Sequence, residues 1–146
     1  MTNNEAADMF LELADLLDLA GELPFKSSSY RKVANSLQNL KEPFQQIVKD
    51  NEFEKIPGTG KAIKEKLVAM ALTGKLPSLE KWRQHEMASF YPWVNNLNLN
   101  PRSLGTLIRK LEAHDFKDLL QKLKNYDIKS LTNKAKDTAA KIIESQ

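Results

Sequence analysis

The chain has 146 residues, of which 41% are hydrophobic and 28% charged, as expected of a globular protein with one domain or two small ones. It contains no cysteine, which excludes disulfides, thiolate metal sites and a cysteine nucleophile. No apolar run approaches the roughly 20 residues that a membrane-spanning helix needs, and residues 1–5 lack the positive charge of a signal peptide. We therefore expect a cytoplasmic protein without a membrane partner, associated with the nucleoid if it is bacterial.

The net charge of +3 is distributed unevenly along the chain. Residues 1–24 carry a charge of −6 with no lysine or arginine, whereas residues 25–87 carry +5 and residues 88–146 carry +4. A one-sided basic charge is typical of proteins that bind polyanions, although it also suits an unevenly solvated surface.

Apolar residues at helical spacing predict a series of helices in the first half of the chain. The first covers residues 3–20, with Thr2 or Asn3 as its cap and Gly21 as its stop. Further helices are expected over residues 25–39, from about Pro43, over 61–73 and over 77–82, with a short helical turn at 51–56.

The second half continues as short helices over about 89–97, 101–113, 115–124 and 132–144. Alternation of β-branched residues is absent, so no strand is expected. The sequence therefore predicts an all-α fold, in which a compact helical domain with a helix-hairpin-helix motif precedes a second, degenerate helix-hairpin-helix region. The expected domain ranges are 1–87 and 88–146.

The turn at residues 56–61 suits a phosphate group. Glycines at 58 and 60 allow positive φ angles and close approach of the backbone to a partner. Amides at the start of the following helix lack intrahelical acceptors, and Lys61 and Lys64 add positive charge. Such a site would hold the DNA backbone without reading base sequence. A plain helix–helix turn is the simpler alternative, whereas a nucleotide P-loop has a different spacing.

Two later segments repeat the order of apolar residue, turn and basic helix. At residues 97–104, both glycine places are taken by asparagine, which tolerates a left-handed backbone better than other residues with side chains. At residues 131–138 they are taken by Asn133 and Ala135, which predicts a further degraded turn.

The chain also contains a specific series of motifs, which are ADMFLELADLL at 7–17, PFK at 24–26, SYRKVA at 29–34, IPGTGKAIKEK at 56–66 and TGKL at 73–76. Through their order and spacing, residues 5–85 resemble the N-terminal domain of the DNA polymerase X family. Residues 90–143 are faintly similar to the helix-hairpin-helix region that follows in that family. No Asp-x-Asp pair occurs, so we expect no DNA polymerase activity.

The resemblance implies a 5′-deoxyribose-phosphate lyase as one alternative, with Lys66 as the Schiff-base nucleophile beside Glu65. Lys26 and Tyr30 also match positions around the family's pocket. The chain departs from lyase-active members where these have further basic residues, because it has Phe25, Glu54, Ala62 and Ser78 there.

The resemblance further implies that the hairpin holds a monovalent cation, K⁺ or Na⁺, through backbone carbonyls. These carbonyls would belong to Glu54, Ile56 and Thr59. No other cofactor is expected.

The leading hypothesis is a DNA-binding protein that contacts phosphates without sequence specificity and acts in DNA repair or maintenance. Its partners would be gapped, nicked or single-stranded DNA and a repair enzyme. The third alternative is a protein-interaction scaffold with vestigial hairpins. The expected DNA contacts are Gly58, Thr59, Gly60, Lys61, Lys64, Lys26, Tyr30, Arg31 and Arg102.

Overall fold

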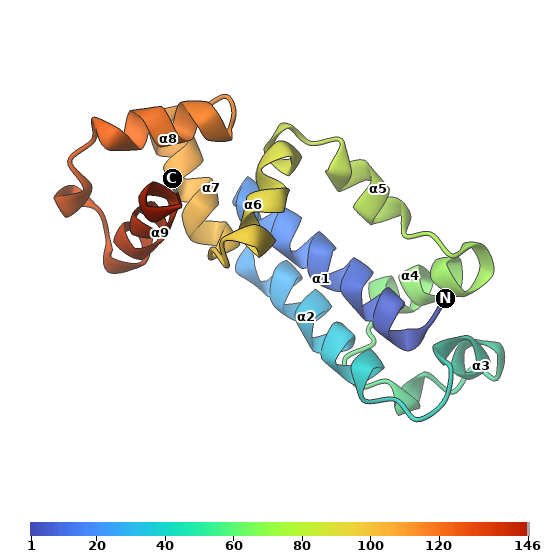
Figure 1. The fold of residues 1–146 in the computed structure, drawn as a ribbon. Coiled ribbons are helices and arrows are strands. Elements are labelled where there is room, and N and C mark those ends of the chain that lie inside the picture. Colours follow the sequence, from blue (N-terminus) through green and yellow to red (C-terminus); the bar gives the residue numbers. More distant parts are fainter. Residues whose placement is uncertain (146) are drawn as a thin grey trace. The chain divides into compact units, whose positions relative to one another are not determined.

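The computed structural model describes residues 1–145, in which all regular structure is helical and no strand occurs (Figure 1). The all-α prediction is confirmed. None of the helices in this range has the length and apolar character to cross a membrane. The α-helices are α1 (Asn3–Ala20), α2 (Pro24–Gln38), α3 (Phe44–Lys49), α4 (Lys61–Thr73), α5 (Pro77–Arg83), α6 (Tyr91–Asn96), α7 (Pro101–Leu111), α8 (Phe116–Lys124) and α9 (Asn133–Glu144).

Three short 3₁₀ helices connect these elements: η1 (Phe53–Lys55), η2 (Glu86–Phe90) and η3 (Ile128–Ser130). The expected helix over 89–97 is wrong at its start, because η2 precedes α6 and Pro92 occupies the first turn of α6. Proline lacks the amide that would continue a preceding helix, which explains this break. The expected helix over 101–113 ends at Leu111, because Glu112 adopts a left-handed conformation with φ of 51°.

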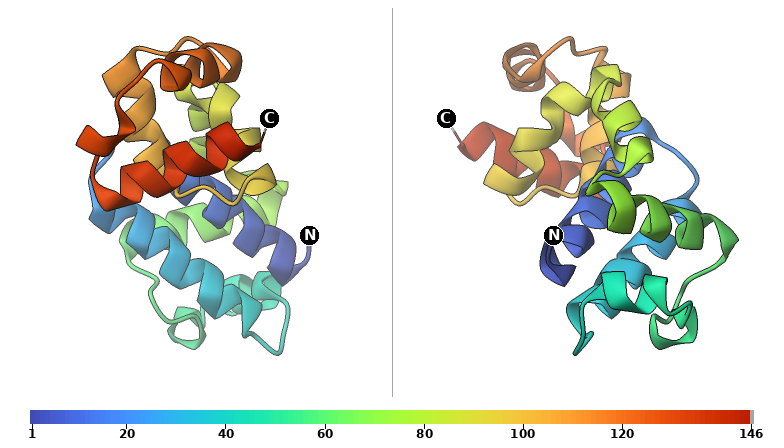
Figure 2. Two further views of the ribbon diagram at one scale, coloured as in Figure 1. Left: turned by 60° about the vertical axis from the view of Figure 1, so that its left-hand side comes forward. Right: turned by 90° about the vertical axis from the view of Figure 1, so that its right-hand side faces the viewer.

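The chain divides into two compact units by its internal contacts. Unit 1 comprises Met1–Ala14 and Leu23–Gln84, and unit 2 comprises Asp15–Glu22 and the chain from His85 onward. The end of α1 thus belongs to unit 2, although it precedes most of unit 1 in sequence. Figures 1 and 2 allow the helices of each unit to be followed by colour.

Each α-helix of unit 1 contributes buried apolar side chains to its core. The start of α1 is fixed by a reciprocal cap, in which Thr2 Oγ1 accepts from the Glu5 amide at 3.0 Å. The Thr2 amide donates to the Glu5 carboxylate in return and lowers the pKa of Glu5 below its usual value. Buried apolar side chains of this core are Phe10, Leu13, Val33, Leu37, Phe44, Ile47, Ile63, Leu67, Met70, Leu76 and Leu79.

Unit 2 packs α7, α8 and α9 against one another, and α7 packs against the end of α1. A Cβ at Gly105 of α7 would lie 2.2 Å from the carbonyl oxygen of Leu19, so the two backbones meet directly there. Arg109 donates to that same carbonyl oxygen at 2.7 Å. The core residues of this unit include Leu104, Leu107, Ile108, Leu119, Leu123, Ala139 and Ile142.

Candidate functional site

The first hairpin lies in unit 1, between η1 and α4. Gly58 has φ of +91°, a conformation that residues with a side chain rarely adopt. Gly60 precedes α4 with φ of −84° and ψ of −179°, which is ordinary extended backbone. The first glycine therefore provides the reversal of the chain, while the second stands at the cap position of α4.

The cap position of α4 is bare. Gly60 has no side chain to accept a hydrogen bond, and a Cβ placed there would have no atom within 4 Å. The first backbone bond of the helix runs from the Lys64 amide to the Gly60 carbonyl at 2.9 Å. Within residues 1–145, the amides of Lys61, Ala62 and Ile63 have no acceptor. The positive end of a 13-residue helix thus presents donors to the surroundings.

Two hydroxyl groups hold the hairpin in place. Ser36 on α2 donates to the carbonyl oxygen of Pro57 at 2.7 Å. Thr59 donates to the carbonyl oxygens of Ile56, at 2.9 Å, and Phe53, at 3.2 Å. Ile56 is 1% exposed, so its side chain anchors the turn in the core of unit 1. The bare end of α4 is therefore presented by a turn that is fixed on both sides.

Lysines surround this turn. Lys61 and Lys64 are exposed on α4, and the Lys64 ammonium lies over the Phe53 ring at 5.4 Å from its centroid. Lys32 on α2 was not predicted, yet its Cγ would be 3.3 Å from a Cβ on Gly58. In the described chain no acidic side chain pairs with Lys32, Lys61 or Lys64. The motif at residues 29–34 contains Lys32, but only the packing of α2 beside the turn places it there.

The candidate lyase residues are only partly brought together. The half-buried Lys66 has its ammonium 5.8 Å from the centroid of the Tyr30 ring, which stacks on Phe10 at 5.9 Å. Lys26 and Glu65 are exposed, and among the described residues no hydrogen bond, ion pair or ring contact joins either of them to Lys66. Arg31 lies on α2 and is partly exposed.

Arg102, predicted to contact DNA, is engaged inside unit 2. Its guanidinium pairs with the buried carboxylate of Asp18 at 2.6 Å and donates to the carbonyl oxygen of Glu22 at 2.7 Å. A buried carboxylate needs such a partner. These contacts give Arg102 a structural role that joins α7 to the end of α1.

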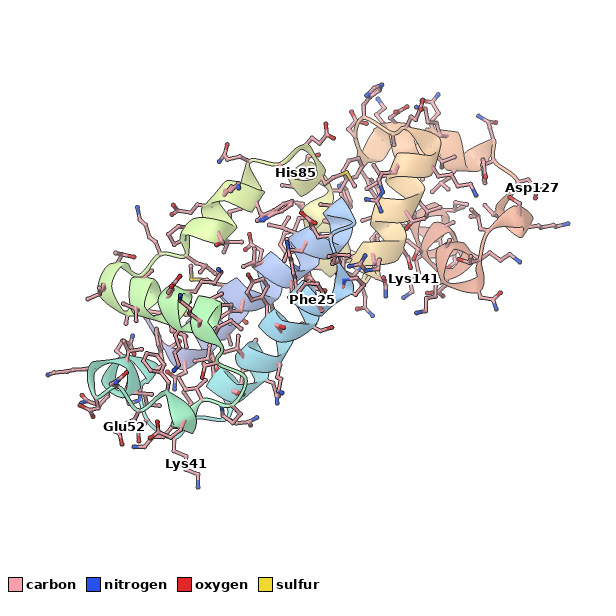
Figure 3. The ribbon with its side chains drawn as sticks, turned by 180° about the vertical axis from the view of Figure 1, so that it is seen from behind. Phe25, Lys41, Glu52, His85, Asp127 and Lys141 are labelled. Atoms are coloured by element: carbon pink, nitrogen blue, oxygen red, sulfur yellow. The ribbon has the colours of Figure 1, made fainter. Side chains whose placement is uncertain are left out.

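The second hairpin, between α6 and α7, keeps the backbone pattern but has fewer open donors, because Pro101 has no amide hydrogen and the Ser103 amide is capped. Asn98 has φ of 51°, as the sequence predicted for a residue in the place of a glycine. Asn100, in the other glycine place, caps α7 by accepting from the Ser103 amide at 3.0 Å. The Lys141 ammonium donates to the Asn98 carbonyl oxygen at 3.1 Å, and Figure 3 shows Lys141 beside this end of α7.

The third segment differs from its prediction. Thr132 caps α9 by accepting from the Ala135 amide at 3.3 Å, so Asn133 and Ala135 lie inside the helix. Their predicted assignment to glycine places is wrong, because α9 begins only two residues after Leu131. None of the residues of this segment has a positive φ.

The residues expected to hold a cation, Glu54, Ile56 and Thr59, line a single pocket of about 370 Å³ in unit 1. Their chemistry fits a cation poorly, however, because the Ile56 carbonyl already accepts the Thr59 hydroxyl and Lys64 lines the same pocket. Figure 3 marks neighbouring Glu52 at this end of unit 1. Residues 1–145 contain no cluster of three or more His, Asp or Glu suited to a metal.

The first half of the chain matches a known protein family. The model of a family described as the helix-hairpin-helix domain matches residues 1–76, which is just over half of the 146 residues. The matched range contains the first hairpin and the helices on both of its sides, α3 and α4.

Proposed function

We infer that this chain, which belongs to the helix-hairpin-helix domain family, binds DNA by gripping the phosphate backbone with its first hairpin. The observation that carries this proposal is the bare start of α4, where three amides without acceptors adjoin two unpaired lysines, Lys32 and Lys61. Amide donors at a helix start and ammonium groups both suit a phosphate oxygen. None of these groups is placed to distinguish bases, so binding would be independent of sequence.

The second hairpin would contribute little to this binding. The side chain of Asn100 occupies an amide of α7 that a phosphate would otherwise use. Glycine at the corresponding position, Gly60, leaves that donor available in the first hairpin. The two turns reverse the chain in the same way but differ in how many helix amides are free to donate. Of these two turns, the first is therefore favoured as the one that binds phosphate.

The test is a fluorescence-polarisation titration of a gapped, 5′-phosphorylated duplex with the full chain. Wild type is compared with a Gly58→Val, Lys61→Glu double variant whose helicity is confirmed by circular dichroism. Lys134→Glu is the matched control, because it places the same charge change in the first turn of α9. We expect the double variant to lose at least about tenfold in affinity, from the lost and reversed phosphate contacts, and the control to bind normally.

Failure of wild type to bind, or equal binding by the double variant, would contradict the proposal. A protein-interaction scaffold would then be the better hypothesis, and an affinity pull-down with the intact chain would test it. Duplex, nicked and single-stranded probes in the same assay identify the preferred DNA, and a preference for a gap would support a place in DNA repair beside a repair enzyme.

A second candidate activity is a 5′-deoxyribose-phosphate lyase, in line with the resemblance to the DNA polymerase X family. The observation that favours it is the placement of Lys66 beside Tyr30, two of the residues expected at such a site. Reaction of the Lys66 amine with the sugar aldehyde would give a Schiff base that borohydride reduces to a stable adduct. A trapped adduct that persists in Lys66→Ala would rule out this assignment.

A further inference from the structure

We propose that the Thr59 hydroxyl closes the first hairpin in place of a monovalent cation, so that the fold of this turn and its binding of DNA do not require K⁺ or Na⁺. The part concerning DNA rests on the proposed function above. The part concerning the fold rests only on the contacts within unit 1.

The first support is the hydrogen bonding of the turn. Thr59 Oγ1 is 2.9 Å from the Ile56 carbonyl oxygen and 3.2 Å from that of Phe53. The hydroxyl proton is therefore directed at two carbonyls, that of Phe53 at the start of η1 and that of Ile56 just after its end. The Phe53 carbonyl oxygen also accepts from the Ile56 amide at 3.0 Å, whereas the Thr59 hydroxyl is the donor to the Ile56 carbonyl. Converging carbonyl oxygens are the arrangement that binds a hard cation, and here a donor from the chain itself satisfies them.

The second support is the charge of the pocket. Lys64 lines it together with Glu54, and the Lys64 ammonium is held over the Phe53 ring. The positive charge of Lys64 thus already compensates the negative charge of Glu54, the acidic residue of the pocket lining. A further cation would enter close to this ammonium and be repelled by it.

The Thr59 hydroxyl and the Lys64 ammonium act on the same residue of the turn, Phe53. Phe53, whose carbonyl accepts from Thr59, is also the residue whose ring lies under the ammonium. Its side chain is 8% exposed, so the ring is a fixed part of the pocket wall. Thr59 satisfies the carbonyls and Lys64 supplies positive charge, which are the two contributions that a bound cation would make.

The test compares Thr59→Val, which has the same shape without the hydroxyl, with Thr59→Ser, which keeps the hydroxyl. Each protein is measured in potassium chloride and in N-methyl-D-glucamine chloride at the same ionic strength. One readout is the melting temperature without DNA. The other is the dissociation constant for the gapped, 5′-phosphorylated duplex.

We expect wild type and Thr59→Ser to show the same melting temperature and affinity in both salts. Thr59→Val leaves the Ile56 carbonyl without a donor, while the Phe53 carbonyl keeps only the Ile56 amide, so K⁺ should become the group that satisfies the Ile56 carbonyl. Its melting temperature should fall when K⁺ is removed, and its affinity should fall by about fivefold, the effect of one hydrogen bond. Thr59→Ala provides a second variant without the hydroxyl if the valine protein does not fold in either salt.

A wild type that loses stability or affinity without K⁺ would overturn the proposal. So would variants without the hydroxyl that remain indifferent to K⁺. If wild type binds no DNA in either salt, the proposed function fails, while the melting temperatures still decide whether the turn needs a cation.

Discussion

The notable feature of Gly60 is that it has no side chain to cap α4. Its φ and ψ are accessible to any amino acid, and a Cβ would meet no atom within 4 Å. Conformation and packing therefore do not require glycine there. What distinguishes it from Asn100, at the same place in the second hairpin, is that it leaves the helix amides open. A capping side chain would stabilise the helix, so we propose that its absence serves the binding of a phosphate group.

Replacement of Gly60 by aspartate should accordingly change stability and DNA affinity in opposite directions. The new carboxylate caps α4 and should raise the free energy of unfolding by roughly 0.5 kcal/mol. It also occupies the amides and repels phosphate, which should weaken DNA binding by about tenfold or more. Denaturant unfolding and fluorescence polarisation measure the two effects.

Gly60→Ala is the control for this change, because it adds a methyl group in open space without a cap or a charge. It should bind DNA nearly as well as wild type. Aspartate and alanine variants of equal affinity would show that the open amides are not used.

At the scale of elements, the interface between α7 and the end of α1 depends on backbone contact. Gly105 lies against the Leu19 carbonyl oxygen, Arg109 donates to that oxygen, and Arg102 donates to the Asp18 carboxylate of the same stretch of α1. Helix pairs approach this closely only where one of them lacks a side chain. The 15–22 segment is therefore held in unit 2 by a glycine and two arginines.

Gly105→Ala should destabilise unit 2 by about 2–3 kcal/mol, because a Cβ would lie 2.2 Å from a backbone atom that has no rotamer with which to move away. Thermal or urea unfolding followed by circular dichroism measures this loss. Thr106→Ala, on the exposed side of the same helix, should stay within about 0.5 kcal/mol of wild type. Similar stability of the two variants would contradict direct backbone packing at Gly105.

For the whole molecule, charge is divided between the two units. Unit 1 has twelve basic and nine acidic residues, which gives +3, whereas unit 2 has ten of each and is neutral. The acids of residues 1–22 are shared between the units, because Glu5, Asp8 and Glu12 belong to unit 1 and Asp15, Asp18 and Glu22 belong to unit 2. The excess of positive charge thus lies in the unit that carries the open hairpin.

The salt dependence of DNA binding should follow this division. Each lysine that neutralises a phosphate contributes about −0.9 to the slope of log affinity against log salt concentration. Lys32→Ala and Lys61→Ala should each make the slope less negative by about that amount, and Lys134→Ala in unit 2 should leave it unchanged. An equal effect of Lys134→Ala would place phosphate contacts in unit 2 as well.

The sequence by itself determined the helical fold and the first hairpin. Helical spacing of apolar residues and local signals such as Thr2, Gly21 and Gly74 act over a few positions, so the helices and their ends follow closely from local chemistry. The same holds for the left-handed Asn98, because few residues with a side chain tolerate that conformation. The role of the hairpin in binding stays a prediction.

Only the tertiary structure decided which side chains serve the turn and which serve the core. Lys32 reaches the turn, and Arg102 turns inward to Asp18, through the packing of helices distant in sequence. Thr59 and Asn100 resemble other polar loop residues until the acceptor or donor opposite each of them is known. Such pairings depend on the positions of groups that no local pattern encodes, which is why composition and spacing could predict the first hairpin but not its contacts.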